Sequence, residues 1–192
     1  MYKICSIEVE ENNKMTLHDC NGNEIKSTNV MNRRYRKSRR LRSTEEDNPV
    51  VWVLIGKDII PQEKYLQVGQ SKNLTRMLSG DIRPDVNEIL SKNGRCNGSK
   101  YSKLASKYSK LTFYEIDFED YDLAEVDFVG NMPQDEDLKK AYLSMKASFI
   151  EGKIAAEKCC GAKENGGGIW NASPSGLDGY FYSYFKNKSK MG

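Results

Sequence analysis

The sequence contains a single histidine, His18, and none of its five cysteines are spaced as in a CxxC clip. A structural zinc site needs four Cys or His ligands at close spacing, so such a site is excluded. Ser-His-Asp and Cys-His hydrolases need an imidazole that a third group holds in place, so these classes are disfavoured. An enzyme with this sequence has to move protons with tyrosine, lysine, a carboxylate or a metal-bound water.

Long hydrophobic runs and an export signal are also missing. No segment approaches the ~20 consecutive apolar residues of a membrane span, and the first residues, MYKICSIEVEENNK, do not read as a signal peptide. With no such signal, an odd number of cysteines favours reduced thiols over a disulfide scaffold. The 192 residues are 38% hydrophobic and 30% charged, which suits one medium domain or a domain with an appended arm. We therefore expect a soluble, cytoplasmic protein.

The net charge of only +3 hides two blocks of opposite sign. Residues 115–137 contain ten carboxylates and no lysine or arginine, and we expect them to form a solvated connector. Residues 33–42 contain seven cations and no acid: Arg33, Arg34, Arg36, Lys37, Arg39, Arg40 and Arg42. This basic run could be a solvated arm or a localisation tag, but the interleaved Tyr35 and the attraction of phosphates favour contact with nucleic acid.

The order of predicted elements indicates an α/β (α+β) protein. Residues 1–30 predict a β-hairpin, and residues 31–49 a basic arm, linker or surface helix. Two strands, VVWVLI and KYLQVG, are followed by a helix from Ser71, a strand at LTFYEIDF and a long amphipathic helix over 135–160. The aromatic cluster at 180–185 is expected in the core. We predict a small central antiparallel sheet flanked by helices in residues 50–192, after the hairpin and the arm.

Five short motifs of the sequence occur in the same order as the motifs of a known protein family. They are VVWVLI, LQVG, QSKNLTRML, the helical IEGKIA and the later WN, together spanning roughly residues 50–171. In this order they resemble the GIY-YIG nuclease superfamily of restriction, repair and homing endonucleases. The resemblance implies hydrolysis of DNA phosphodiesters with Mg²⁺ or Mn²⁺.

The site residues that the resemblance implies are only partly present. In that superfamily a tyrosine acts as general base or orients the attacking water, a helix arginine stabilises charge on the phosphate, and a glutamate holds the metal. Glu151 occupies the glutamate position, but the arginine position falls on Met77, one residue after Arg76. The other motif positions fall on Trp52, Gln67, Gly69 and Asn171.

Two hypotheses follow from this partial match. In the first, neighbours rebuild the site: Tyr65, expected on the same strand face as Gln67, together with Lys72, Arg76 and Glu151 as the metal ligand. In the second, the domain has lost catalysis and binds nucleic acid or a protein partner. A third, weaker hypothesis is a small-ligand protein with an acidic face. The expected partner is double-stranded DNA rather than a membrane, and a homodimer would suit a palindromic target.

Overall fold

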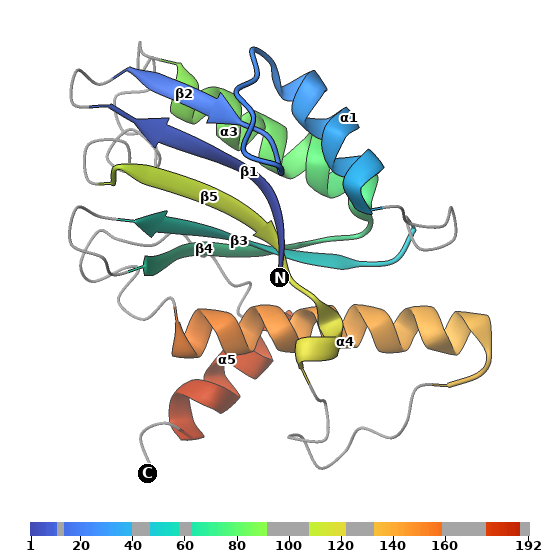
Figure 1. The fold of residues 1–192 in the computed structure, drawn as a ribbon. Helices are drawn as coiled ribbons and strands as arrows, with labels where there is room; N and C mark the ends of the chain where they lie inside the picture. The colour runs from blue at the N-terminus through green and yellow to red at the C-terminus, as the bar shows by residue number, and fades with distance from the viewer. Residues whose placement is uncertain are drawn as a thin grey trace.

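The computed structural model describes residues 1–10, 14–39, 47–57, 63–91, 108–121, 133–158 and 176–188. Five antiparallel strands form one sheet in the order β2-β1-β5-β3-β4 (Figure 1). The strands are β1 (Tyr2–Val9), β2 (Met15–His18), β3 (Val50–Lys57), β4 (Glu63–Ser71) and β5 (Lys110–Glu115). Because β1 pairs with β5, the predicted N-terminal hairpin belongs to the same sheet as the strands of the later segment.

Helices cover both faces of this sheet. One face carries α1 (Thr28–Arg39), α2 (Leu74–Arg76), the π-helix η1 (Met77–Ile82) and α3 (Arg83–Leu90). The other carries α4 (Glu136–Glu157), α5 (Leu177–Lys188) and the 3-10 turn η2 (Phe118–Asp120) (Figure 1). The predicted antiparallel sheet with flanking helices is therefore confirmed.

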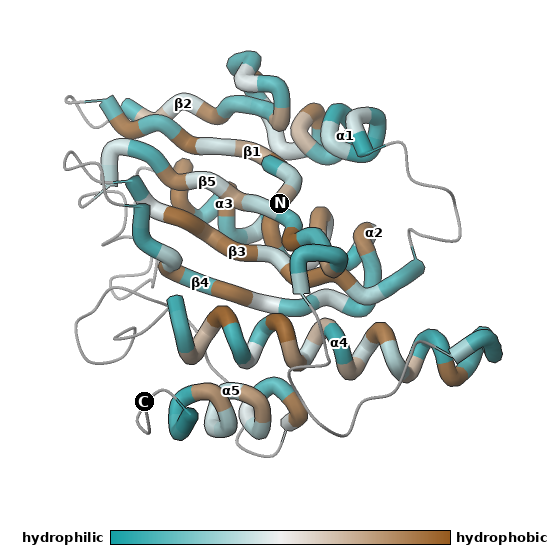
Figure 2. Tube along the Cα trace, turned by 60° about the horizontal axis from the view of Figure 1, so that its bottom comes forward, coloured by the Kyte–Doolittle hydropathy of each residue, from teal (hydrophilic) through white to brown (hydrophobic). Residues whose placement is uncertain are grey.

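Strand β3 shows why the chain folds into three layers. Its side chains alternate, so that Val50, Trp52 and Leu54 join the core under α1–α3 while Val51, Val53 and Ile55 join the core under α4. A central strand covered on both faces has no polar face, which explains the continuous apolar run. Figure 2 shows the resulting brown stretch in the middle of the sheet.

The long helix and the aromatic tail form as predicted. The Asp135 side chain accepts from the N–H groups of Asp137 and Leu138 and so caps α4, which ends at Glu157, three residues before the predicted end. On α5, Phe181 and Phe185 meet Phe149 of α4 edge to face, with ring centroids 5.5 and 5.3 Å apart. The two phenylalanines of the tail therefore pack in the core, whereas Tyr180 is exposed.

The basic run lies on α1 as far as Arg39, and this helix packs on the sheet through Met31 and Tyr35. It is the surface helix of the three predicted forms rather than a free arm. Arg40 and Arg42 lie outside the described residues. Within the described segments, no helix is both long and apolar enough to cross a membrane.

Candidate functional site

The motif positions Trp52, Gly69 and Met77 form part of the core under α1–α3. The Trp52 indole covers Gly69 so closely that a Cβ there would lie 2.7 Å from Cζ2 of the ring. Met77 is fully buried, and the indole Nε1 of Trp52 has no hydrogen-bond partner within the described part of the chain. These positions supply shape and apolar contact, and no hydroxyl or charge.

The prediction that Tyr65 and Gln67 share a strand face is wrong. Tyr65 pairs with Ile55 and Gln67 with Leu54, so that β4 has an extra residue, Leu66, at a β-bulge. The bulge turns Gln67 toward the α1–α3 side and leaves Tyr65 on the α4 side. There the ring of Tyr65 lies 4.9 Å from Nζ of Lys158, just past the last turn of α4.

Two residues at the C-terminal end of β4, Gln70 and Ser71, form hydrogen bonds with the helical layers on opposite faces of the sheet. On one face, Gln70 Nε2 donates to Ser148 Oγ on α4 at 3.2 Å. On the other, the hydroxyl of Ser71 donates to the carboxylate of Asp81, and Arg76 Nε lies 3.4 Å from the same carboxylate. Since β4 is the last strand of the described sheet, groups from both faces lie close to one edge.

Glu151 lies at this same end of β4. It is only 7% exposed, and it follows Ser148 by three residues, so the two are neighbours on one side of α4. The Gln70–Ser148 and Tyr65–Lys158 contacts show that α4 runs antiparallel to β4. Glu151 is about 4.5 Å further along the helix axis than Ser148, which places it near the stretch from Val68 to Gln70.

The structure therefore places only some of the predicted site residues near one another. Arg76 and Glu151 flank the end of β4, from opposite faces. Lys72 is exposed immediately after β4. Tyr65 lies several residues away along the strand, about 13 Å before Gly69 at the usual strand rise. Asn171 is outside the described residues.

A magnesium ion would find oxygen ligands at Glu151. No group of three or more His, Cys, Asp or Glu side chains converges within the described ranges. Mg²⁺ does not require such a group, because it keeps several waters and binds one or two carboxylates together with substrate phosphates. Glu151 supplies one carboxylate at this end of β4, and a bound phosphate would have to supply further oxygen ligands to a magnesium ion.

The cations of α1 serve two different purposes. Arg34 Nη1 lies 2.6 Å from the carboxylate of fully buried Asp19, and Arg39 Nη2 lies 3.0 Å from Glu115, so both hold the helix to the sheet. Arg33 and Lys37 are exposed. Arg36 Nη2 donates to Thr75 Oγ1 at 2.7 Å, one residue before Arg76. Arg33 and Lys37 are thus the outward cations of α1, and Arg36 joins this helix to the residue before Arg76.

Sequence reasoning missed a buried polar network at the start of the acidic block. Glu115, expected in a solvated connector, is 5% exposed and accepts a 2.5 Å hydrogen bond from the hydroxyl of Tyr35. Burial, and then the charge of Glu115, raise the pKa of Tyr35. The signal was present in the sequence, since Tyr35 and Arg39 are four apart on a helix and face the same side.

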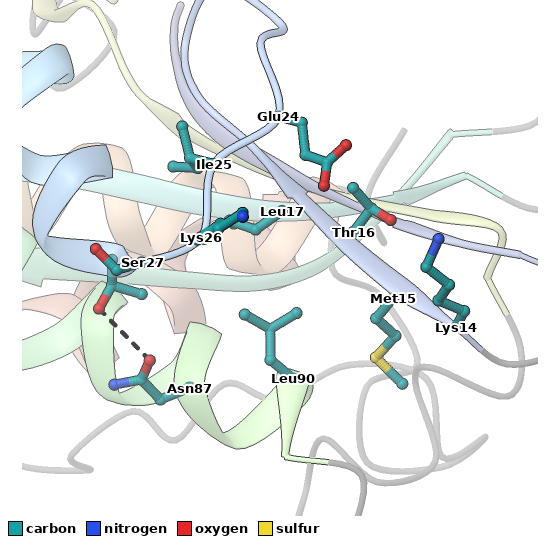
Figure 3. Close-up of a pocket in the computed structure, with 11 residues that line it drawn as sticks. Lys14, Met15, Thr16, Leu17, Glu24, Ile25, Lys26, Ser27, Asn87 and Leu90 are labelled. Atoms are coloured by element: carbon teal, nitrogen blue, oxygen red, sulfur yellow. Dashed lines mark hydrogen bonds between the residues drawn. The ribbon is translucent and has the colours of Figure 1, made fainter.

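A pocket of about 380 Å³ lies near the other edge of the sheet, between β2, residues 24–28 and α3. In Figure 3, Leu17, Ile25 and Leu90 form part of its apolar lining, with Lys14 and Lys26 among the polar side chains around it. Because β2 and β4 are opposite edges of the sheet, this pocket is not part of the site at β4.

Comparisons of the chain with protein families, with curated proteins and with solved structures found no match.

Proposed function

We propose that the chain is a metal-dependent DNA endonuclease of the GIY-YIG type, with its site at the C-terminal end of β4. The pair of contacts at this end carries the proposal: Gln70 bonds Ser148 beside Glu151, and Ser71 and Arg76 meet at Asp81. The sequence pieces that carry the resemblance lie, in chain order, on β3, β4, the helices after β4 and α4.

In this proposal each residue acts on a phosphate at the edge of β4. Glu151 would hold a magnesium ion, and the chemistry that such an ion would supply is neutralisation of charge on the leaving oxygen. Arg76 binds the phosphoryl oxygens, and Lys72 and the outward cations of α1 hold the neighbouring backbone. Arg76 is 58% exposed, so its ion pair with Asp81 contributes little to stability and can be exchanged for a phosphate at low cost.

A binding module without catalysis is the second candidate. It is favoured by Trp52 and Met77, which put core side chains where the family has a tyrosine and an arginine. Tyr65, the predicted replacement for the phenol, lies at the Lys158 end of α4, two turns from Glu151. This module would use the same cations to bind DNA and would leave the strand intact.

Plasmid nicking separates the two candidates. Purified protein is incubated with supercoiled plasmid and Mg²⁺ or Mn²⁺, beside Glu151→Ala and, as a matched control, Glu157→Ala on the exposed end of α4. The nuclease proposal predicts nicks with the wild type and Glu157→Ala, and none with Glu151→Ala. Cleavage that persists in Glu151→Ala would remove the assigned metal ligand. Salt-sensitive DNA binding without nicks under either ion would establish the binding module instead.

A further inference from the structure

A second cavity, of about 200 Å³, lies where α1 ends, beside the first residue of β1 and the last of β5. Its lining is mostly apolar and includes Leu143 of α4. The polar groups that reach it are few and come from separate parts of the chain: Tyr2, Arg39, Asn48, Glu115 and Asp117. Small apolar cavities with a few convergent polar groups are typical binding sites.

The polar side of this cavity is held in place before any ligand binds. The guanidinium of Arg39 lies 3.5 Å above the ring of Tyr2 and 3.0 Å from Glu115, which Tyr35 fixes in turn. The Tyr2 hydroxyl donates to Asp117 at 2.6 Å. That hydrogen bond is the main reason that the pKa of Asp117 is lowered, so this carboxylate stays ionised at neutral pH. The cavity is thus lined by a guanidinium and a carboxylate that other side chains hold in place.

Size and chemistry together select the ligand. Pockets for drug-sized ligands usually measure about 300–1,000 Å³, so this smaller one fits a single ring system rather than a whole nucleotide. A carboxylate accepts from adjacent N–H groups, and a guanidinium donates to paired acceptors. Guanine carries N–H donors on one edge and the acceptors O6 and N7 on another. We propose that the cavity binds one guanine base.

The position of the cavity connects it with the DNA-binding surface, and as part of a nucleic-acid site the inference rests on the proposed function. Arg39, which lines the cavity, is the last residue of α1, the helix whose outward cations include Arg33 and Lys37. A backbone held along α1 could place one unstacked base in the cavity, with its sugar and phosphate outside. In other proteins, unstacked bases bind between aromatic and apolar side chains.

Guanosine tests the cavity without any nucleic acid. Backbone-amide NMR titrations with guanosine, adenosine, cytidine and uridine should show saturable shifts for guanosine at residues 115–118, and affinities about tenfold or more weaker for the other three. Asp117→Asn, which can still accept from Tyr2, should weaken guanosine binding about tenfold. Asp120→Asn, at an exposed carboxylate outside the cavity, should leave it unchanged. Leu143→Trp should abolish binding by filling the space while every polar group stays.

A second titration locates the source of the base. Single-stranded oligothymidylates with one central dG, dA or abasic position should bind the wild type with a preference for dG, which Asp117→Asn abolishes while its affinity for the abasic strand stays the same. Failure of every nucleoside and absence of a dG preference would overturn the inference, yet leave the proposed function standing if the strands still bind. Guanosine binding without strand binding would instead overturn the proposed function and support a site for a free guanine nucleoside.

Discussion

At the scale of single residues, Gly69 is fixed by the indole above it. A methyl group at this position would lie 2.7 Å from Trp52 Cζ2, and the indole also packs against Phe113, with ring centroids 6.1 Å apart. We predict that Gly69→Ala lowers the free energy of unfolding by about 1–3 kcal/mol. Denaturant unfolding followed by Trp fluorescence measures this change.

Gly80→Ala is the control for Gly69→Ala. A Cβ at Gly80 would meet the Arg76 side chain at 2.8 Å, and that side chain is exposed and can move away. Gly80→Ala should lose clearly less stability than Gly69→Ala, because alanine is also more favourable than glycine in a helix by about 1 kcal/mol. Equal losses for both variants would show that the Trp52 contact does not determine the choice of residue at 69.

Asp19 gives the stability a defined dependence on pH. Burial is the largest influence and raises the pKa of this carboxyl, but the hydrogen bonds from Arg34 and from Asn23 together lower it below the ordinary value. A lowered pKa stabilises the fold above the unfolded-state value of about 3.9, and this stabilisation is lost as the pH falls toward the folded-state value. Asp19→Asn should therefore reduce the difference in unfolding free energy between pH 6 and pH 3. An unchanged difference would contradict the role of the Arg34 pair.

At the scale of elements, α5 depends on a glycine in α4. A Cβ at Gly152 would lie 2.7 Å from Asp178 O and Tyr182 N, both backbone atoms of α5. Because backbone atoms cannot rotate away, Gly152→Ala should displace α5 and cost about 1–3 kcal/mol. Hydrogen exchange of the α5 amides should accelerate, whereas Ser144→Ala on the exposed side of α4 should leave it unchanged. Exchange as slow as in the wild type would show that the helices are packed differently.

The sequence predicts the helices and strands better than it predicts which side chains of these elements are in contact. Alternation in β3 and the period of α4 identify these elements because each buries a regular face. The bulge at Leu66 cannot be read in this way, since one extra residue changes the facing of Tyr65 without altering the apolar pattern. The π-helix at Met77–Ile82 likewise interrupts a helix predicted as regular. The motif position predicts a role for Glu151, which stays a prediction. The burial of Glu115 at the end of β5 was missed, because a carboxylate in an acidic block is expected to be solvated.

At the scale of the whole molecule, the outward cations of α1 should determine the salt dependence of DNA binding. Each phosphate neutralised contributes about 0.9 to the slope of log K against log salt. Replacing both Arg33 and Lys37 by alanine should therefore reduce the slope by about 2, as measured by fluorescence anisotropy. Replacing Lys139 and Lys140 on α4 changes the net charge equally and should leave the slope unchanged. Equal reductions would mean that net charge, and not the α1 surface, attracts DNA.

Paramagnetic broadening by Mn²⁺ tests the proposed metal site at the end of β4. Mn²⁺ is titrated into the complex with a short DNA duplex while backbone amides are observed by NMR. We predict that the amides of Gln70, Ser148 and Gly152 broaden first and that this broadening is lost in Glu151→Ala. Broadening centred elsewhere, or unchanged by that substitution, would contradict it.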